Sequence, residues 1–290
     1  MRELVVLSGK GGTGKTSITG SLAVLANNTV LVDCDVDAAN LHLLLSPKIE
    51  ETFDFYGGIK AMIDTDACIN CDRCREVCQY GAINKNEYYE VNEMGCEGCK
   101  VCFYECPVDA ISVHDHLTGE YYKSSTKYGP MVHAEIGVAE GNSGKLVAEV
   151  KEVARSITAE GQLILIDGPP GIACPVISSL SGADYALLVT EPTVSGIHDL
   201  ERVLELIKQF NVKPMICINK ADISEIQKNR IVKYCKDNNL DIVGQINYDE
   251  AFIEALKQGE PIVNYDAESS SSVEIKEMWK RILERIDYSN

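Results

Sequence analysis

The sequence predicts an α/β protein with a doubly wound, mostly parallel sheet that is interrupted by a small, cysteine-rich α+β domain. Short apolar runs alternate with helical segments along most of the chain, which is the pattern of a parallel sheet covered by helices. A glycine-rich loop follows the first apolar run, and eight cysteines gather between Cys68 and Cys106. These observations set the order in which the elements are expected.

The first expected element is a buried strand over residues 4–7, a short apolar run. It leads into S-G-K-G-G-T-G-K-T, residues 8–16, and an apolar-periodic helix follows. This spacing matches the P-loop in its required context of strand, loop and helix, whose backbone N–H groups surround phosphate oxygens. The predicted nucleotide site consists of Gly9, Lys10, Gly11, Gly12, Thr13, Gly14, Lys15, Thr16 and Ser17. Lys15 is expected on the β- and γ-phosphates, and the Thr16 hydroxyl on Mg²⁺.

The cysteine block contains one short sequence twice, 28 residues apart. The first copy is C-I-N-C-D-R-C-R-E-V-C from Cys68, and the second is C-E-G-C-K-V-C-F-Y-E-C from Cys96. Both copies have the C-x₂-C-x₂-C-x₃-C spacing of bacterial two-cluster ferredoxins. Zinc sites usually combine two C-x₂-C pairs, and disulfides need an oxidising compartment. The spacing therefore predicts two iron–sulfur clusters.

This block resembles the bacterial ferredoxin domain, and the resemblance implies that the fourth cysteine of each copy binds the cluster of the other copy. It assigns to the first 4Fe–4S cluster Cys68, Cys71, Cys74 and Cys106. It assigns to the second 4Fe–4S cluster Cys78, Cys96, Cys99 and Cys102. Pro107 follows the last cysteine of the second copy, as in that family, whereas the first copy has Gln79 there.

Lys10 gives the loop the form K-G-G-T-G-K-T, the deviant Walker A motif. In this the chain resembles the MinD/ParA/Mrp class of ATPases, which includes the nitrogenase iron protein. The resemblance covers nearly the whole chain outside the cysteine block, and it is closest to P-loop ATPases that carry an inserted ferredoxin domain. It implies a homodimer in which Lys10 reaches the nucleotide of the partner, with slow hydrolysis unless a partner protein is present.

Two acidic segments extend the resemblance. In L-V-D-C-D-V-D-A-A-N, residues 31–40, it implies that Asp33 lies near the metal and that Asp35 orients the attacking water. In L-I-L-I-D-G-P-P-G, residues 163–171, it implies that Asp167 holds Mg²⁺ through water. The expected catalytic residues are Lys10, Lys15 and Asp35.

The segment I-N-K-A-D, residues 218–222, is similar to a base-recognition loop, with Asn219 and Asp222 at the nucleotide. Many GTPases read guanine with an N-K-x-D sequence, so Asp222 also suggests GTP. The signature lysine Lys10 favours ATP.

The composition and net charge exclude several classes of partner. The chain has 290 residues, 45% hydrophobic and 24% charged, as in an ordinary globular protein. Its formal net charge of −17 argues against nucleic acid and anionic membranes as partners. We expect no signal peptide and no membrane span, and twelve cysteines with eight in ligand spacing suggest a reducing cytoplasm.

We expect an ATPase domain over residues 1–61 and 116–290, and a ferredoxin-like insert over residues 62–115. Further strands are expected over residues 163–166, 185–190, 215–219 and 242–246. The favoured function couples nucleotide state to electron transfer or metallocluster handling on a client protein. The alternatives are an ATPase that assembles or carries clusters, and a non-hydrolysing electron carrier on a nucleotide-binding scaffold.

Four smaller features are read as structural. Cys34 and Cys217 lie in apolar strands and are expected in the core. The apolar stripe of the last helix, residues 275–286, is expected to pack on the sheet rather than on a membrane. A structural role is favoured for His133 over sensing of nucleotide or cluster, and for Cys174 over redox chemistry.

Overall fold

The computed structural model describes residues 1–137 and 140–286, and within it the chain divides into two compact units. The larger unit contains Met1–Thr52, Tyr121–Glu135 and Ser143–Asn290. The smaller unit contains Phe53–Glu120 and Ile136–Asn142. The smaller unit holds both copies of the cysteine repeat, and the larger unit holds the P-loop.

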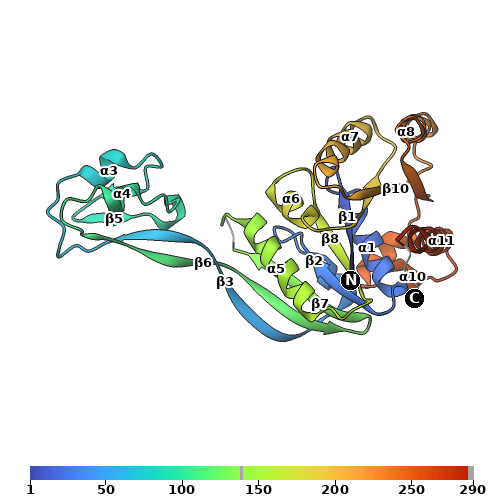
Figure 1. The fold of residues 1–290 in the computed structure, drawn as a ribbon, viewed down its shortest axis with the longest axis horizontal. Helices are drawn as coiled ribbons and strands as arrows, with labels where there is room; N and C mark the ends of the chain where they lie inside the picture. Colours follow the sequence, from blue (N-terminus) through green and yellow to red (C-terminus); the bar gives the residue numbers. More distant parts are fainter. Residues whose placement is uncertain (138–139, 287–290) are drawn as a thin grey trace. The chain divides into compact units, whose positions relative to one another are not determined.

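The described chain forms a nine-stranded sheet with the order β11-β10-β9-β1-β8-β2-β7-β6-β3 (Figure 1). Its strands are β1 (Arg2–Ser8), β2 (Thr29–Asp33), β3 (Lys48–Ile63), β6 (Ile111–Thr126), β7 (Gly129–Ile136), β8 (Leu163–Pro170), β9 (Tyr185–Thr190), β10 (Lys213–Asn219) and β11 (Asp241–Ile246). β1 is parallel to both β8 and β9, β2 is parallel to β7 and β8, and β10 is parallel to β9 and β11. The prediction of an α/β fold with a mostly parallel sheet is confirmed.

β1 is the point from which the chain winds in both directions. The next strand, β2, lies beyond β8 on one side, while β9 to β11 follow one another on the other side. Ligands of such sheets bind outside the carboxyl ends of the strands at this switch point. The P-loop follows the carboxyl end of β1, so it lies at the switch point where a ligand is expected.

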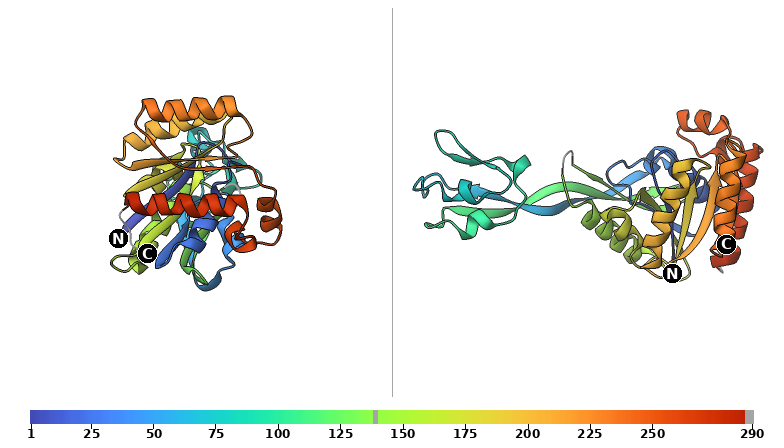
Figure 2. Two further views of the ribbon diagram at one scale, coloured as in Figure 1. Left: turned by 90° about the vertical axis from the view of Figure 1, so that its right-hand side faces the viewer. Right: turned by 90° about the horizontal axis from the view of Figure 1, so that it is seen from above.

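Helices cover both faces of the parallel part of the sheet (Figures 1 and 2). One layer packs together α1 (Lys15–Leu25), α2 (Leu41–Leu45), α10 (Ile262–Tyr265) and α11 (Ser270–Ile286). The other face carries α5 (Ser143–Ile157), α6 (Cys174–Leu180), α7 (Val194–Lys208) and α8 (Glu225–Asp237), and α9 (Ala251–Lys257) precedes α10. α11 buries Ile275, Met278, Trp279, Ile282 and Ile286 in the core, so the prediction that its stripe packs on the sheet is confirmed.

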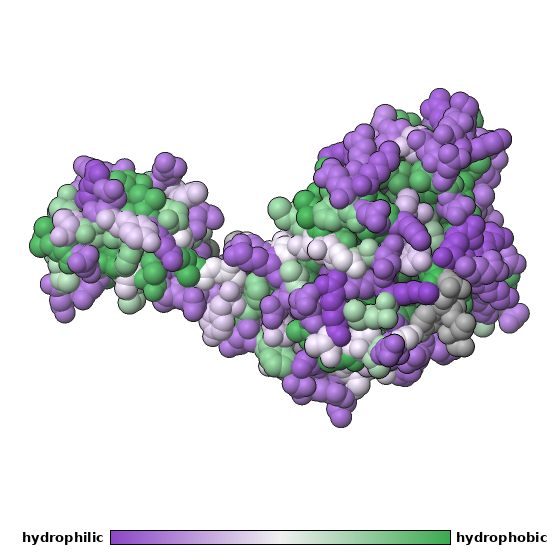
Figure 3. Space-filling view, in the orientation of Figure 1, coloured by the Kyte–Doolittle hydropathy of each residue, from purple (hydrophilic) through white to green (hydrophobic). Residues whose placement is uncertain are grey.

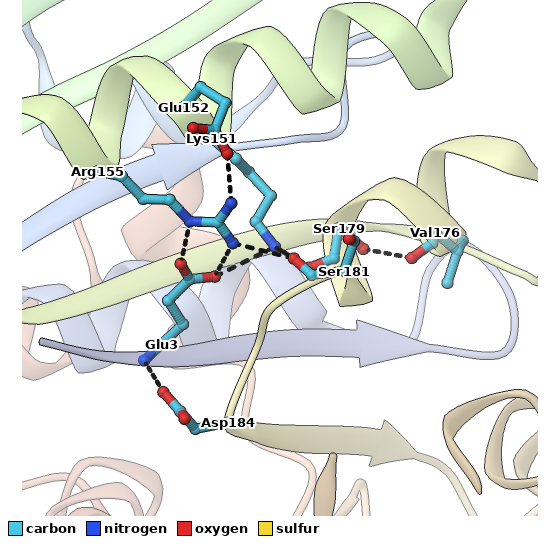
Figure 4. A network of polar contacts seen from close by, with 8 residues as sticks. All are labelled: Glu3, Lys151, Glu152, Arg155, Val176, Ser179, Ser181 and Asp184. Atoms are coloured by element: carbon cyan, nitrogen blue, oxygen red, sulfur yellow. Dashed lines mark hydrogen bonds and ion pairs between the residues drawn. The ribbon is translucent and has the colours of Figure 1, made fainter. Parts of the chain in front are cut away.

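A buried polar network fastens α5 to β1 and to the end of α6 (Figure 4). Lys151 Nζ lies 2.6 Å from the Ser179 carbonyl oxygen, 2.7 Å from that of Ser181 and 3.2 Å from Glu3 Oε2. Arg155 donates to both carboxylate oxygens of Glu3. Burial lowers the pKa of Lys151, and the Glu3 carboxylate opposes this. The network satisfies a charged pair that would be costly to bury alone.

The smaller unit builds its cysteine region from short elements. They are α3 (Arg73–Val77), β4 (Ile83–Lys85), β5 (Tyr89–Val91), the 3₁₀ turn η1 (Glu93–Gly95) and α4 (Val101–Tyr104). β4 and β5 form an antiparallel pair with Ile83 opposite Val91. A small core of its own includes Ala61, Ile83, Tyr89 and Ile111.

The sequence repeat is also a backbone repeat. Positive φ angles recur at positions 28 residues apart: 58° and 62° at Asn70 and Gly98, and 66° and 63° at Asp72 and Lys100. The second pair is followed directly by α3 in the first copy and by α4 in the second. Since side chains other than glycine rarely adopt positive φ, matched occurrences in both copies indicate one loop design used twice.

Candidate functional site

The P-loop fills the turn between β1 and α1. Gly12 and Gly14 have φ angles of 78° and 88°, which favour glycine. A Cβ on Gly14 would lie 2.3 Å from Asn219 Nδ2, so any other residue at position 14 would displace this amide. That same Nδ2 donates to the Thr13 carbonyl oxygen at 2.7 Å. Asn219, at the end of β10, therefore positions the loop.

The functional side chains of α1 converge on Asp167, which lies in β8 and is fully buried. Lys15 Nζ lies 2.9 Å from Asp167 Oδ1 and 3.8 Å from Asp35 Oδ2. The Thr16 hydroxyl donates to Asp167 Oδ2 at 2.7 Å, and the Thr19 hydroxyl donates to Oδ1 at 2.8 Å. Burial lowers the pKa of Lys15, but Asp167 and the neighbouring carboxylates outweigh burial and leave that pKa raised. The structure thus brings Lys15, Thr16, Asp35 and Asp167 together.

Asp33 and Asp35 follow the end of β2 and are held differently. The Asp33 carboxylate accepts the backbone N–H groups of Asp35 at 3.0 Å and Leu41 at 3.1 Å. Burial and then the charge of Asp167 raise the pKa of Asp33. Burial raises the pKa of Asp35 to about 6, although Lys15 opposes the shift. Buried carboxylates that resist ionisation together are the environment in which a bound cation is favoured.

The residues fit Mg²⁺ held jointly with a nucleotide. Within residues 1–137 and 140–286, no group of three or more His, Cys, Asp or Glu side chains is arranged to hold a metal ion alone. Mg²⁺ usually binds one or two carboxylates together with phosphates and water, rather than a cage made by protein. The Thr13 hydroxyl oxygen is buried without a hydrogen-bond partner in the described structure, so this hydroxyl is available to donate a hydrogen bond to a phosphate.

Lys10 is bound within its own chain. Its Nζ lies 2.6 Å from Glu191 Oε1 and 3.0 Å from Ser195 Oγ. Lys220 Nζ lies 3.1 Å from Glu191 Oε2 and also donates to the Gly12 carbonyl oxygen at 3.1 Å. Sequence reasoning missed Glu191, whose only signal was its place at the carboxyl end of β9. The role of Lys10 across a dimer stays a prediction.

A partly open cavity adjoins the P-loop. Its lining includes Gly12, Gly14, Ser17, Asn219, Lys220, Asn247, Tyr248, Asp249, Phe252, Ile253 and Leu256. Asp222 is not in that lining, and its Oδ1 accepts the backbone N–H of Tyr248 at 2.7 Å. The structure therefore places Asn219 at this cavity and uses Asp222 to hold the loop beside it.

The eight repeat cysteines divide between two cavities of the smaller unit. The first cavity is lined by Cys68, Cys71, Cys74 and Cys106. The second cavity is lined by Cys78, Cys96, Cys99 and Cys102. Each cavity thus combines three cysteines of one copy with the fourth cysteine of the other.

Matched backbone contacts support the fourth cysteine in each cavity. The Ala82 N–H donates to Cys78 Sγ at 3.4 Å, and the Ala110 N–H donates to Cys106 Sγ at 3.3 Å. Apolar side chains complete the walls, including Ile63 in the first cavity and Val113 in the second. Among the described residues, these cysteines form no group arranged to hold a single metal ion.

The remaining cysteines and His133 lie apart from these sites. Cys34 and Cys217 are fully buried, so the prediction that they are core residues is confirmed, while Cys174 is exposed at the start of α6. Burial raises the pKa of Cys217 to about 12. His133 Nε2 lies 3.0 Å from Ser124 Oγ, and burial lowers the pKa of this histidine to about 4. In the described chain, no helix is long and apolar enough to cross a bilayer.

The chain matches known nucleotide-binding proteins. A family model described as the CobQ/CobB/MinD/ParA nucleotide binding domain matches residues 4–262. The uncharacterized protein MJ0578 of Methanocaldococcus jannaschii is 36% identical over 228 residues, covering 77% of this chain and 80% of that protein. The septum site-determining protein MinD of Bacillus subtilis is 23% identical over 289 residues, covering 97% and 88%.

Solved structures show the same fold. MinD from Pyrococcus horikoshii, solved with Mg-ADP, has a TM-score of 0.64 at 19% identity and covers 100% of this chain and 99% of its own. MinD in the MinC:MinD complex of Aquifex aeolicus has a TM-score of 0.59 at 21% identity, covering 98% and 96%. At such identities the likeness concerns the fold.

Proposed function

Because the chain belongs to the CobQ/CobB/MinD/ParA family of nucleotide-binding proteins, we propose that it is a Mg-ATP hydrolase that carries two 4Fe–4S clusters. Its proposed role is to couple nucleotide state to electron transfer, or to metallocluster handling, on a client protein in a reducing cytoplasm. The observation that carries the proposal is the division of eight cysteines between two cavities of a chain that also has an intact P-loop.

Two ligand sets support the clusters. The first set is Cys68, Cys71, Cys74 and Cys106, and the second is Cys78, Cys96, Cys99 and Cys102. Backbone N–H groups already point at Cys78 and Cys106, and such hydrogen bonds to sulfur are among the features that set cluster potential. When bound, the clusters would supply one-electron redox chemistry.

The nucleotide roles follow the contacts around Asp167. Lys15 would neutralise the β- and γ-phosphates, since it is a buried ammonium at the N-terminus of α1. Thr16 and Asp167 would hold Mg²⁺, with Asp33 close by, and the metal would neutralise charge on the phosphates. Asp35 would orient the attacking water, because its carboxylate lies 3.8 Å from Lys15 Nζ at the phosphate end of the site.

The base pocket favours ATP over GTP. A carboxylate that reads guanine must face the base and accept its N–H groups. Asp222 instead accepts the Tyr248 N–H, whereas Tyr248, Phe252 and Ile253 line the cavity beside the P-loop and would give a base apolar surface to pack on. Asn219 would act indirectly, by holding the P-loop through the Thr13 carbonyl.

The route of the chain supports coupling. Leu41, the first residue of α2, donates its N–H to Asp33, and β3 begins three residues after α2 ends. The chain therefore passes from the Asp33/Asp35 segment into the smaller unit before it returns to Asp167. We propose that ATP closes a homodimer in which Lys10 leaves Glu191 and binds the nucleotide of the partner subunit. Movement of the Asp33 segment would then reach the strand that enters the smaller unit.

Anaerobic purification followed by iron analysis and an ATPase assay tests the proposal. We expect about eight iron atoms per chain, since each 4Fe–4S cluster contains four. We expect Mg²⁺-dependent hydrolysis that Lys15→Ala abolishes while iron content stays unchanged. Iron with no hydrolysis, even when both clusters are reduced, would favour the non-hydrolysing electron carrier. Transfer of iron to an apo-ferredoxin on ATP addition would favour cluster delivery over electron transfer.

A further inference from the structure

The two copies of the cysteine repeat share a backbone but differ in the surface of their helices. Three matched positions, 28 residues apart, lie on α3 in the first copy and on α4 in the second. These pairs are Arg73 with Val101, Arg75 with Phe103, and Glu76 with Tyr104. At these matched positions, therefore, α3 is charged and α4 is apolar.

The charges of α3 are satisfied within the smaller unit. Arg73 Nη2 lies 2.6 Å from Glu105 Oε2, and Arg75 Nε lies 2.7 Å from Asp72 Oδ1 with a second nitrogen on Oδ2. Bidentate pairs of this kind leave few donors for another protein. The α3 face is thus a solvated, internally paired surface.

The α4 face, which we define as Val101, Phe103 and Tyr104, is apolar and exposed. Tyr104 is 75% exposed and Val101 41%. The rings of Phe103 and Tyr104 meet edge to face with centroids 5.1 Å apart, which holds both in place. Aromatic residues are enriched at protein interfaces. Figure 3 shows apolar patches on the surface of this unit.

This face lies directly beside the second cavity. Cys102, which lines that cavity, sits between Val101 and Phe103 in α4 and is 9% exposed. A protein docked on the α4 face would therefore approach the second cluster closely.

Charge selects the kind of partner. The residues of the smaller unit include fourteen Asp or Glu and five Lys or Arg. Such an acidic unit attracts a basic surface, and it repels the smaller unit of another copy as well as an anionic bilayer.

We propose that the α4 face docks a redox protein with an apolar contact patch and a basic rim, which exchanges electrons with the second cluster. This inference rests on the proposed clusters. One electron leaves the reduced 4Fe–4S cluster and enters the oxidised centre of the partner, so the cluster is oxidised and the partner is reduced, with no bond made or broken.

Stopped-flow reduction of ferric cytochrome c, a basic haem protein, tests the proposal on the full-length protein reduced with dithionite and freed of excess reductant. Phe103→Ser combined with Tyr104→Ser is compared with Arg75→Ser combined with Glu76→Ser at the matched positions. Both pairs leave the net charge unchanged. We expect the α4 pair to lower the second-order rate constant about tenfold or more, as loss of central aromatic contacts does. We expect the α3 pair to stay within about twofold, and the wild-type rate to fall as salt is added.

Equal slowing by both pairs, or a wild-type rate independent of salt, would overturn the docking surface. So would a wild-type homodimer that is lost in the α4 pair, because the face would then belong to a second copy. Iron content is measured on every variant, and Tyr104→Ser alone serves if the double variant does not fold. Full iron with an unslowed α4 variant refutes this inference alone, whereas absence of iron from the wild type refutes the proposed function as well.

Discussion

Replacing Cys106 with serine tests which copy of the repeat completes which cavity. Cys106 lines the first cavity with Cys68, Cys71 and Cys74, although the three other cysteines of its own copy line the second cavity. Serine removes the thiolate while leaving the fold of the loop nearly unchanged. If each cavity holds one 4Fe–4S cluster, iron should fall from about eight to about four atoms per chain.

A second substitution identifies the cluster that remains. Adding Cys71→Ser to Cys106→Ser damages the same cavity twice, so iron should stay near four atoms per chain. Adding Cys99→Ser to Cys106→Ser damages both cavities, so nearly all iron should be lost. Substitutions that act on one site are not additive, whereas those at separate sites are. Cys174→Ser, at an exposed cysteine outside both cavities, is the control and should keep all the iron.

Iron analysis and visible absorption of anaerobically purified protein provide the measurement. The opposite pattern, in which Cys106→Ser with Cys71→Ser loses everything and Cys106→Ser with Cys99→Ser keeps half, would mean that each copy completes its own cluster. The crossed assignment would then be wrong.

Three further predictions concern the larger unit. Lys10→Ala should still bind ATP but lose ATP-dependent dimerisation and hydrolysis, which sedimentation and phosphate release would measure; a wild-type rate would contradict action across the dimer. His133 keeps its full stabilising effect above its ordinary pKa of 6.5 and loses it as pH falls toward the folded pKa of about 4. Between pH 7 and pH 5, the free energy of unfolding should therefore fall by about 2 kcal/mol less in His133→Gln than in the wild type, as measured by urea titration. Equal falls in the two proteins would contradict this. Lys151→Ala should cost about 3 kcal/mol because it breaks a buried ion pair. Lys233→Ala, in an exposed pair, should cost less than about 1 kcal/mol in the same unfolding assay, and equal costs would contradict the argument.

Local patterns were enough to predict the parallel sheet and the loop at its switch point. The expected strand over residues 185–190 coincides with β9, and that over 242–246 differs from β11 by one residue. β9 is buried along nearly its whole length and therefore appears as an apolar run, whereas β11, at the edge of the sheet, keeps Asp241 and Gln245 exposed. The P-loop is similarly local, because its glycines and Lys15 are consecutive in sequence.

No local sequence pattern predicts the long strand β3 or the pairing of Lys10 with Glu191. Most residues of β3 are partly or fully exposed, and Gly57 and Gly58 interrupt it, so neither alternation nor an apolar run marks it as a strand. Glu191 meets Lys10 only because β9 and β1 are neighbours in the sheet. The sequence predicts Asp222 at the nucleotide, and it gives no sign of the contact with Tyr248, which depends on two loops meeting in space. Contacts of this kind follow from topology rather than from spacing along the chain.

The exchange of cysteines between copies has a consequence for biosynthesis. Neither cavity takes all four of its cysteines from one copy, so a growing chain that ends before Cys96 lacks the full set of cysteines for either cavity, however well its first copy has folded. The second cavity gains its last cysteine at Cys102, and the first cavity waits until Cys106 leaves the ribosome. Iron loading by the proposed crossed ligation would therefore begin only after both copies are made, and the cavity whose loop is synthesised first would be the last to have all its ligands.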